Sequence, residues 1–88
     1  MVLNDSRLKA CNVLRQLLNG ETLKFYGVDV KWFNEDATYE EDGKIKRADK
    51  SGIYKNIPVV TPKRQHKYNK WVFIEISVDE FVEMCKLS

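Results

Sequence analysis

This chain of 88 residues has a single histidine and no cluster of glycines. His66 is the single histidine, and a catalytic triad or a histidine-based metal site needs partners that one histidine does not supply. The four glycines are scattered at positions 20, 27, 43 and 52, so the chain has no glycine-rich loop to hold a phosphate. We therefore expect a protein that is not an enzyme and that uses no cofactor and no metal ion.

Long apolar segments are also missing. No run approaches the roughly 20 apolar residues that cross a bilayer. Residues 1–5 lack the basic and then apolar layout of a secretory signal. We expect a cytoplasmic protein without a membrane partner.

Cysteine is limited to Cys11 and Cys85, which lie near opposite ends of the chain. Their separation does not match the spacing of metal ligands, and neither has a histidine close by in sequence. This pattern predicts two reduced, partly buried thiols. A disulfide between two terminal helices is the alternative.

The composition is that of an ordinary globular protein, with 43% apolar and 32% charged residues. A chain of this length has room for one hydrophobic core. We therefore expect a single domain over residues 1–88.

The first third of the chain predicts a helix followed by β structure. Apolar residues recur at three- and four-residue steps over residues 5–19, which is typical of a helix with one buried face, and Gly20 can end it. Residues 22–26 and 28–33 are rich in aromatic and β-branched residues around Gly27. They predict either two strands or one bulged strand.

Residues 34–50 have no apolar periodicity and indicate a long exposed loop or a polar hairpin that turns at Asp42 and Gly43. A strand is expected over residues 52–60, with Pro58 favouring a sheet edge. Residues 71–76 are apolar on both faces, which predicts a central strand. Ser77 and Glu80 have the spacing of a capping box before a helix over residues 78–86. The expected fold class is α+β, an antiparallel sheet of about four strands with an N-terminal and a C-terminal helix packed on it.

Charge is strongly segregated along the chain. The segment from Lys44 to Lys70 carries nine basic residues and the single acid Asp49, a net charge of +8. The segments before and after it each carry −3, so that the whole chain is only +2. A block of one sign attracts polyanions or an acidic protein surface.

Aromatic and imidazole side chains are interleaved with these cations, a combination that neutralises phosphates and stacks on bases. The candidate binding residues for a partner or an anion are Lys63, Arg64, His66, Lys67, Tyr68, Lys70, Lys44, Lys46 and Arg47. Alternatively, Tyr54 and Trp71 belong to the core and the lysines keep a small protein soluble.

An acidic run precedes the basic segment. It consists of Glu35, Asp36, Glu40, Glu41 and Asp42, and it does not match the spacing of a calcium-binding loop. We expect either a solvated loop or a second, acidic surface that contacts a basic partner.

The segment from Val13 to Phe25 resembles the helix, glycine and strand that begin many small phage-encoded proteins, among them sponges that sequester nucleotide signals of bacterial defence systems. The composition of the chain, which is rich in lysine and contains tyrosine and asparagine, is similar to that of small anti-CRISPR and host-takeover proteins from phages of low-GC bacteria. After Trp32, however, the chain continues with Phe33, Asn34 and Glu35, whereas the sponge pattern has a glycine and a tyrosine soon after this tryptophan. The ligand-binding residues of the sponges are therefore not assigned to positions of this chain. The resemblance implies a compact inhibitor that acts by binding.

Two functional hypotheses follow. The first is a phage-type inhibitor that acts in the host bacterial cytoplasm and binds a defence protein, such as a CRISPR–Cas ribonucleoprotein, or a nucleic-acid-processing protein. The second is a protein that binds or sequesters a nucleic acid or nucleotide with the basic segment 44–70. The sequence also allows a homodimer that pairs the edge strand over residues 53–60.

Overall fold

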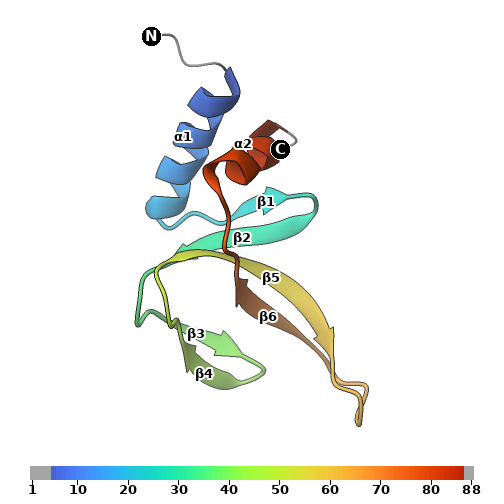
Figure 1. Ribbon diagram of the computed structural model, residues 1–88. Helices are drawn as coiled ribbons and strands as arrows, with labels where there is room; N and C mark the ends of the chain where they lie inside the picture. The colour runs from blue at the N-terminus through green and yellow to red at the C-terminus, as the bar shows by residue number, and fades with distance from the viewer. Residues whose placement is uncertain (1–4, 87–88) are drawn as a thin grey trace.

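The computed structural model describes residues 5–86, and these form two helices and six strands (Figure 1). In chain order the elements are α1 (Asp5–Leu18), β1 (Leu23–Phe25), β2 (Val28–Phe33), β3 (Thr38–Glu41), β4 (Lys44–Arg47), β5 (Gly52–Val60), β6 (Lys67–Phe73) and α2 (Val78–Lys86).

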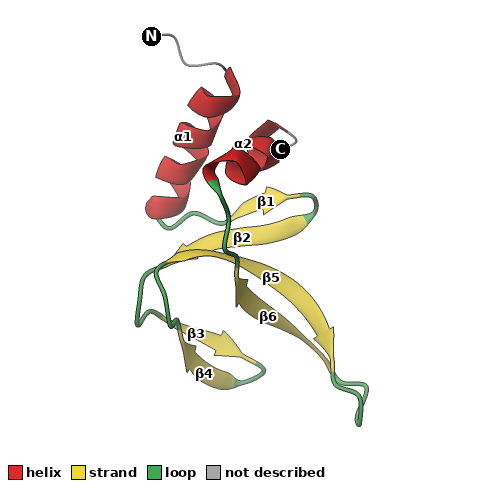
Figure 2. Ribbon diagram, viewed as in Figure 1, coloured by secondary structure: helices red, strands yellow, loops and turns green. Residues whose placement is uncertain are grey.

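Four of the strands form one antiparallel sheet in the order β1-β2-β5-β6, and β3 and β4 form a separate two-stranded sheet. Figure 2 shows both helices gathered at the end of the molecule where β1 and β2 lie, while the β5–β6 hairpin extends away from them. The predicted α+β class, with an N-terminal and a C-terminal helix and a four-stranded antiparallel sheet, is confirmed.

Local signals set the ends of both helices. After α1, Gly20 has a φ of +90°, its N–H donates to the Leu17 carbonyl at 3.0 Å, and the Glu21 N–H donates to the Gln16 carbonyl at 3.2 Å. These two bonds form a Schellman motif, which satisfies carbonyls at the helix end. At the start of α2, the Ser77 hydroxyl accepts a hydrogen bond from the Glu80 N–H at 3.1 Å, as the capping box predicted.

Both short hairpins turn on a residue with positive φ followed by glycine. Tyr26 (φ 53°) and Gly27 (φ 78°) connect β1 to β2, so this region is two strands and not one bulged strand. Asp42 (φ 52°) and Gly43 (φ 78°) connect β3 to β4. Two successive positive φ values define the type I′ turn, which matches the twist of a hairpin. Of the two alternatives for residues 34–50, the polar hairpin is therefore correct.

The sheet has an apolar cluster on each face. On one face, α1 and α2 cover Val30 and Ile53, with Leu17 and Cys85 completely buried between the layers. On the other face, Phe33, Ala48 and Tyr54 are buried, and half-buried aromatic residues from β3 and β6 pack around them. Both faces of the sheet therefore contribute to the core.

The prediction that residues 71–76 form a central strand is wrong. β6 ends at Phe73 and is the edge strand of the sheet, next to β5 alone. Its apolar character has a different origin: Trp71 and Phe73 pack in the cluster around Tyr54, while Ile74 and Ile76 follow the strand and pack in the helix-side cluster.

β5 is paired on both sides over only a short stretch. Gly52–Lys55 pair with β2 and Tyr54–Val60 pair with β6, so that Tyr54 and Lys55 pair on both sides and residues 56–60 pair with β6 alone. Pro58 lies among residues 56–60, where one edge of the strand is free and the missing N–H costs nothing, as the sequence predicted. The edge of β5 available for pairing with a second copy is therefore restricted to residues 56–60.

The two cysteines differ in environment. Neither is in a disulfide; Cys85 is completely buried and Cys11 is exposed, which corrects the expectation that both are partly buried. Burial raises the pKa of the Cys85 thiol, and nearby Lys9 opposes that shift.

Candidate functional site

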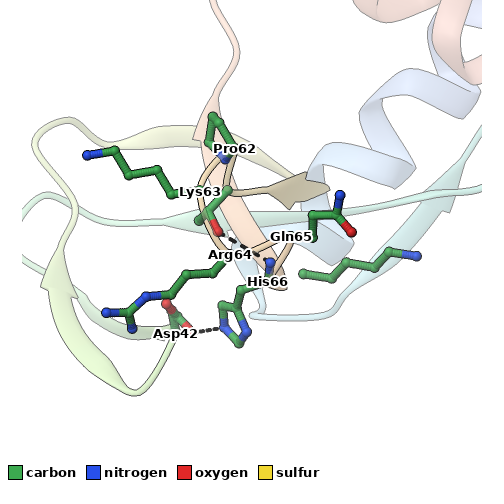
Figure 3. Close-up of a pocket in the computed structure, with 8 residues that line it drawn as sticks. Asp42, Pro62, Lys63, Arg64, Gln65 and His66 are labelled. Carbon is green, nitrogen blue, oxygen red and sulfur yellow. Dashed lines mark hydrogen bonds and ion pairs between the residues drawn. The ribbon is translucent and has the colours of Figure 1, made fainter.

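The loop between β5 and β6 carries the densest group of predicted binding residues at the far end of the β5–β6 hairpin. Backbone hydrogen bonds close this loop: the Gln65 N–H donates to the Thr61 carbonyl and the Thr61 N–H donates to the His66 carbonyl, both at 3.0 Å. The Thr61 hydroxyl accepts a further bond from the His66 N–H at 3.3 Å. Figure 3 shows the side chains of residues 63–65 leaving the loop in different directions. We call residues 61–67 the basic tip.

A hydrogen bond connects the basic tip to the turn of the β3–β4 hairpin. Nε2 of His66 lies 2.7 Å from Oδ1 of Asp42, and the two side chains are 52% and 43% exposed (Figure 3). Because a carboxylate only accepts hydrogen bonds, Nε2 carries the proton in this contact. The His66 ring also stacks on Tyr68, with ring centroids 6.1 Å apart and an angle of 20° between the planes. His66 therefore holds the tips of two hairpins together.

The basic tip and Asp42 surround an open hollow of about 890 Å³. Lys63, Arg64 and Lys67 line it and are exposed. Among residues 5–86, no ion pair engages any of these three cations. Their charges are therefore available to an anionic ligand.

The remaining predicted cations fall into a second group. Lys44, Lys46 and Arg47 all lie on β4 and are exposed. Arg47 lines a hollow between the β3–β4 hairpin and β6, together with Lys50 and Lys70. Tyr68, the remaining predicted binding residue, is half-buried and contacts the tip through His66. The structure thus brings Lys63, Arg64 and Lys67 together at the tip, and Arg47 and Lys70 beside β6. Lys44 and Lys46 line neither hollow.

Aromatic side chains form the wall of this second hollow. Tyr39, Trp71 and Phe73 line it, and the Tyr39 and Trp71 rings both pack on Phe33, with centroid distances of 5.3 and 5.4 Å. We call this hollow, of about 350 Å³, the seam. Burial raises the pKa of the Tyr39 phenol, and Glu41, Tyr54 and Asp49 add to the shift, so the hydroxyl stays neutral at physiological pH.

Tyr39 and Lys50 were missed as site residues by the sequence analysis. Tyr39 alternates with exposed residues in β3, which is a strand pattern, but four residues give a weak signal. Lys50 is placed at the seam by Tyr54, whose hydroxyl donates to the Lys50 carbonyl at 2.8 Å. Only the tertiary fold brings these residues beside β6.

The acidic residues are spread along the β3–β4 hairpin. Glu41 lies directly opposite Lys44, and Asp42 contacts the basic tip. Glu35 and Asp36 lie at the other end of the hairpin, where the Glu35 N–H donates to the Ser51 hydroxyl at 2.7 Å and the Asp36 N–H to the Ala48 carbonyl at 2.9 Å. Acidic and basic groups therefore share this hairpin.

Within residues 5–86, no three histidine, cysteine, aspartate or glutamate side chains are grouped so that they could hold a metal ion. Neither α1 nor α2, the helices of the described chain, is long and apolar enough to cross a membrane. No family model, no curated protein and no solved structure matches this chain. The geometry of the tip and the seam is accordingly the basis for a functional proposal.

Proposed function

We propose that this protein is a non-enzymatic nucleic-acid-binding protein that contacts phosphates with its β5–β6 hairpin. The observation that carries the proposal is the basic tip, where Lys63, Arg64 and Lys67 project from a two-stranded arm and have no anionic partner within residues 5–86. Exposed cations without an anionic partner attract phosphates. When they neutralise the phosphates, the counterions condensed on the nucleic acid are released.

The shape of the arm supports the same proposal. The molecule measures 54 × 25 × 19 Å, and its β5–β6 hairpin projects away from the helices (Figure 1). A narrow projecting ribbon reaches a nucleic acid without bringing the acidic helix α2 close to the phosphates. Asp79, Glu80 and Glu83 lie on that helix.

Neutralising the tip tests this proposal. Lys63→Gln combined with Arg64→Gln should weaken binding of a fluorescent oligonucleotide of about 12 nucleotides, because two phosphate contacts are lost. The matched control is Arg15→Gln combined with Lys24→Gln, which removes the same charge from exposed positions on α1 and β1. Equal losses of affinity in the two double variants, measured by fluorescence anisotropy, would show that net charge and not the tip is responsible.

A protein partner is the second candidate. The observation that favours it is the mixture of charges on the β3–β4 hairpin, where Glu41 faces Lys44 and Asp42 lies against the basic tip. Such a surface suits a protein with both charges better than a phosphate array. In this case the protein would be a phage-type inhibitor of a defence ribonucleoprotein or a nucleic-acid-processing protein in the bacterial cytoplasm.

A pull-down from bacterial lysate separates the two candidates. The tagged protein is incubated with and without nuclease, and the retained material is identified by mass spectrometry. Material that disappears after nuclease treatment supports nucleic-acid binding. A protein complex that is retained equally in both arms, and that is lost from the tip variant, supports the inhibitor.

A further inference from the structure

The seam combines stacking surfaces with cations on its rim. Tyr39 from β3 and Trp71 from β6 supply half-buried rings, and Arg47, Lys50 and Lys70 supply three positive charges against the single acid Asp49. Its volume of about 350 Å³ lies within the range of pockets that hold small ligands. Aromatic rings next to cations are the arrangement with which proteins bind unpaired bases and their phosphates.

The aromatic rings are fixed before any ligand arrives. Phe33 is buried, and Tyr39, Tyr54 and Trp71 all pack on it at centroid distances between 5.2 and 5.4 Å. Because these rings are already ordered, a base that stacks on them causes little further loss of side-chain entropy. The seam is therefore a preorganised platform.

The cations of the seam are positioned by separate contacts. Lys50 is held by the hydrogen bond from the Tyr54 hydroxyl to its carbonyl, and its Nζ lies 5.5 Å from the centroid of the Phe73 ring. Arg47 is on β4, and Lys70 is on β6. The hollow is thus bordered by positive charge from three different segments of the chain.

The seam and the basic tip are connected along β6. Lys67 lines the tip hollow and Trp71 lines the seam; the two residues share a face of β6, and four residues of a strand span about 13 Å. A single nucleic-acid strand that contacts the tip with its phosphates can therefore continue to the seam. The neutral hydroxyl of Tyr39 adds no negative charge that would repel it.

We infer that the seam binds an unpaired base, so that the nucleic acid recognised by this protein is single-stranded, with the base stacked on Tyr39 and Trp71 and its phosphate near Arg47 and Lys70. This inference rests on the proposed function. It deepens that proposal because a duplex, whose bases are already stacked and paired, cannot use the platform.

Three probes of about 12 nucleotides test the inference with the full chain: single-stranded oligo-dT, an abasic strand with the same number of phosphates, and a duplex. The expected result is that oligo-dT binds at least about fivefold more tightly than the abasic strand, which is the lower end of the effect of stacking one base. Equal affinity for oligo-dT and the abasic strand, or tighter binding of the duplex, would overturn the inference and leave the proposed phosphate contacts intact. Binding of none of the three probes would overturn the proposed function itself.

A pair of variants at one position assigns the effect to the seam. Tyr39→Leu removes the ring but keeps an apolar side chain against Phe33, and Tyr39→Phe keeps the ring and removes only the hydroxyl. Tyr39→Leu should bring the affinity for oligo-dT down by about fivefold or more, to that of the abasic strand, whereas Tyr39→Phe should keep the preference. Circular dichroism verifies that both variants are folded, and Arg47→Gln on an exposed strand position provides a second test that leaves the aromatic packing untouched. A preference for oligo-dT that is unchanged in Tyr39→Leu, or an affinity for oligo-dT that is unchanged in Arg47→Gln, would show that bases bind elsewhere.

Discussion

Leu17 and Leu18 are neighbours on α1 with opposite surroundings. Leu17 is completely buried between the helices and the sheet, and Leu18 is 55% exposed. Leu17→Ala should reduce the free energy of unfolding by about 2–5 kcal/mol, because it removes buried methyl groups and leaves a cavity. Leu18→Ala should change it by less than about 0.5 kcal/mol. Urea unfolding of both variants measures the difference, and similar losses would contradict the packing described for α1.

Cys11 and Cys85 provide a second contrast at the residue scale. A thiol-reactive reagent should label exposed Cys11 immediately and Cys85 only as the protein unfolds, because Cys85 is completely buried. Mass spectrometry of the protein during labelling gives the order of modification. Simultaneous rapid labelling of both thiols would show that α2 does not stay packed on α1.

The raised pKa of Cys85 has a consequence for stability. Since the folded state favours the protonated thiol, its contribution is fully present below the pKa of the unfolded chain, near 9.0, and is lost as the pH rises through the higher folded value. The free energy of unfolding should therefore fall above about pH 9. The slope of that fall should be smaller in Cys85→Ala, although this variant is less stable at every pH because of its cavity.

At the scale of elements, His66 and Asp42 couple the β3–β4 hairpin to the β5–β6 arm. The coupling should be about 0.2–1 kcal/mol, the usual value for an exposed ion pair. A double-mutant cycle with Asp42→Asn and His66→Gln measures it, and asparagine suits Asp42 because it tolerates the positive φ of that turn position. A coupling energy of zero, with unchanged hydrogen exchange in β3 and β4, would mean that the two hairpins are held together without this pair.

The sequence predicted those elements whose signals are local. The helical period and Gly20 placed α1, the spacing of Ser77 and Glu80 placed the start of α2, and Asp42 with Gly43 placed a hairpin turn. The position of β6 at the sheet edge was not predictable, because the apolar run over residues 71–76 serves two clusters on opposite faces: Ile74 and Ile76 after the strand pack in the first, and Trp71 and Phe73 within β6 pack in the second. The second cluster forms only when the β3–β4 hairpin lies against β6, a contact between segments distant in sequence.

The same distinction applies to the candidate site. The cations of the basic tip follow one another in the chain and were identified as a group from their charge alone. Tyr39 was missed because it lies in a polar segment, and its partners Trp71 and Phe33 come from other strands. A run of charge is visible in a sequence, whereas a hollow lined by residues from β3, β4, β5 and β6 requires the fold.

The whole molecule separates its helices from its basic tip along its length. The helices and the buried residues of the helix-side cluster occupy one end, and the basic tip lies at the far end of an elongated shape of 54 × 25 × 19 Å (Figure 1). The acidic helix α2 thus lies with β1 and β2, away from the tip. This arrangement gives a chain of net charge +2 a local field that is strongly positive at one end.

The most direct test of this account is the salt dependence of the affinity of the full chain for a single-stranded oligonucleotide, measured by fluorescence anisotropy between about 50 and about 200 mM salt. Three or four phosphate contacts, each releasing about 0.7 counterion, predict that the logarithm of the association constant falls with the logarithm of the salt concentration with a slope of about −2 to −3. The slope should become less steep by about one to two in the Lys63→Gln, Arg64→Gln double variant. A flat dependence, or no binding at the lowest salt concentration, would show that the basic tip does not bind phosphates.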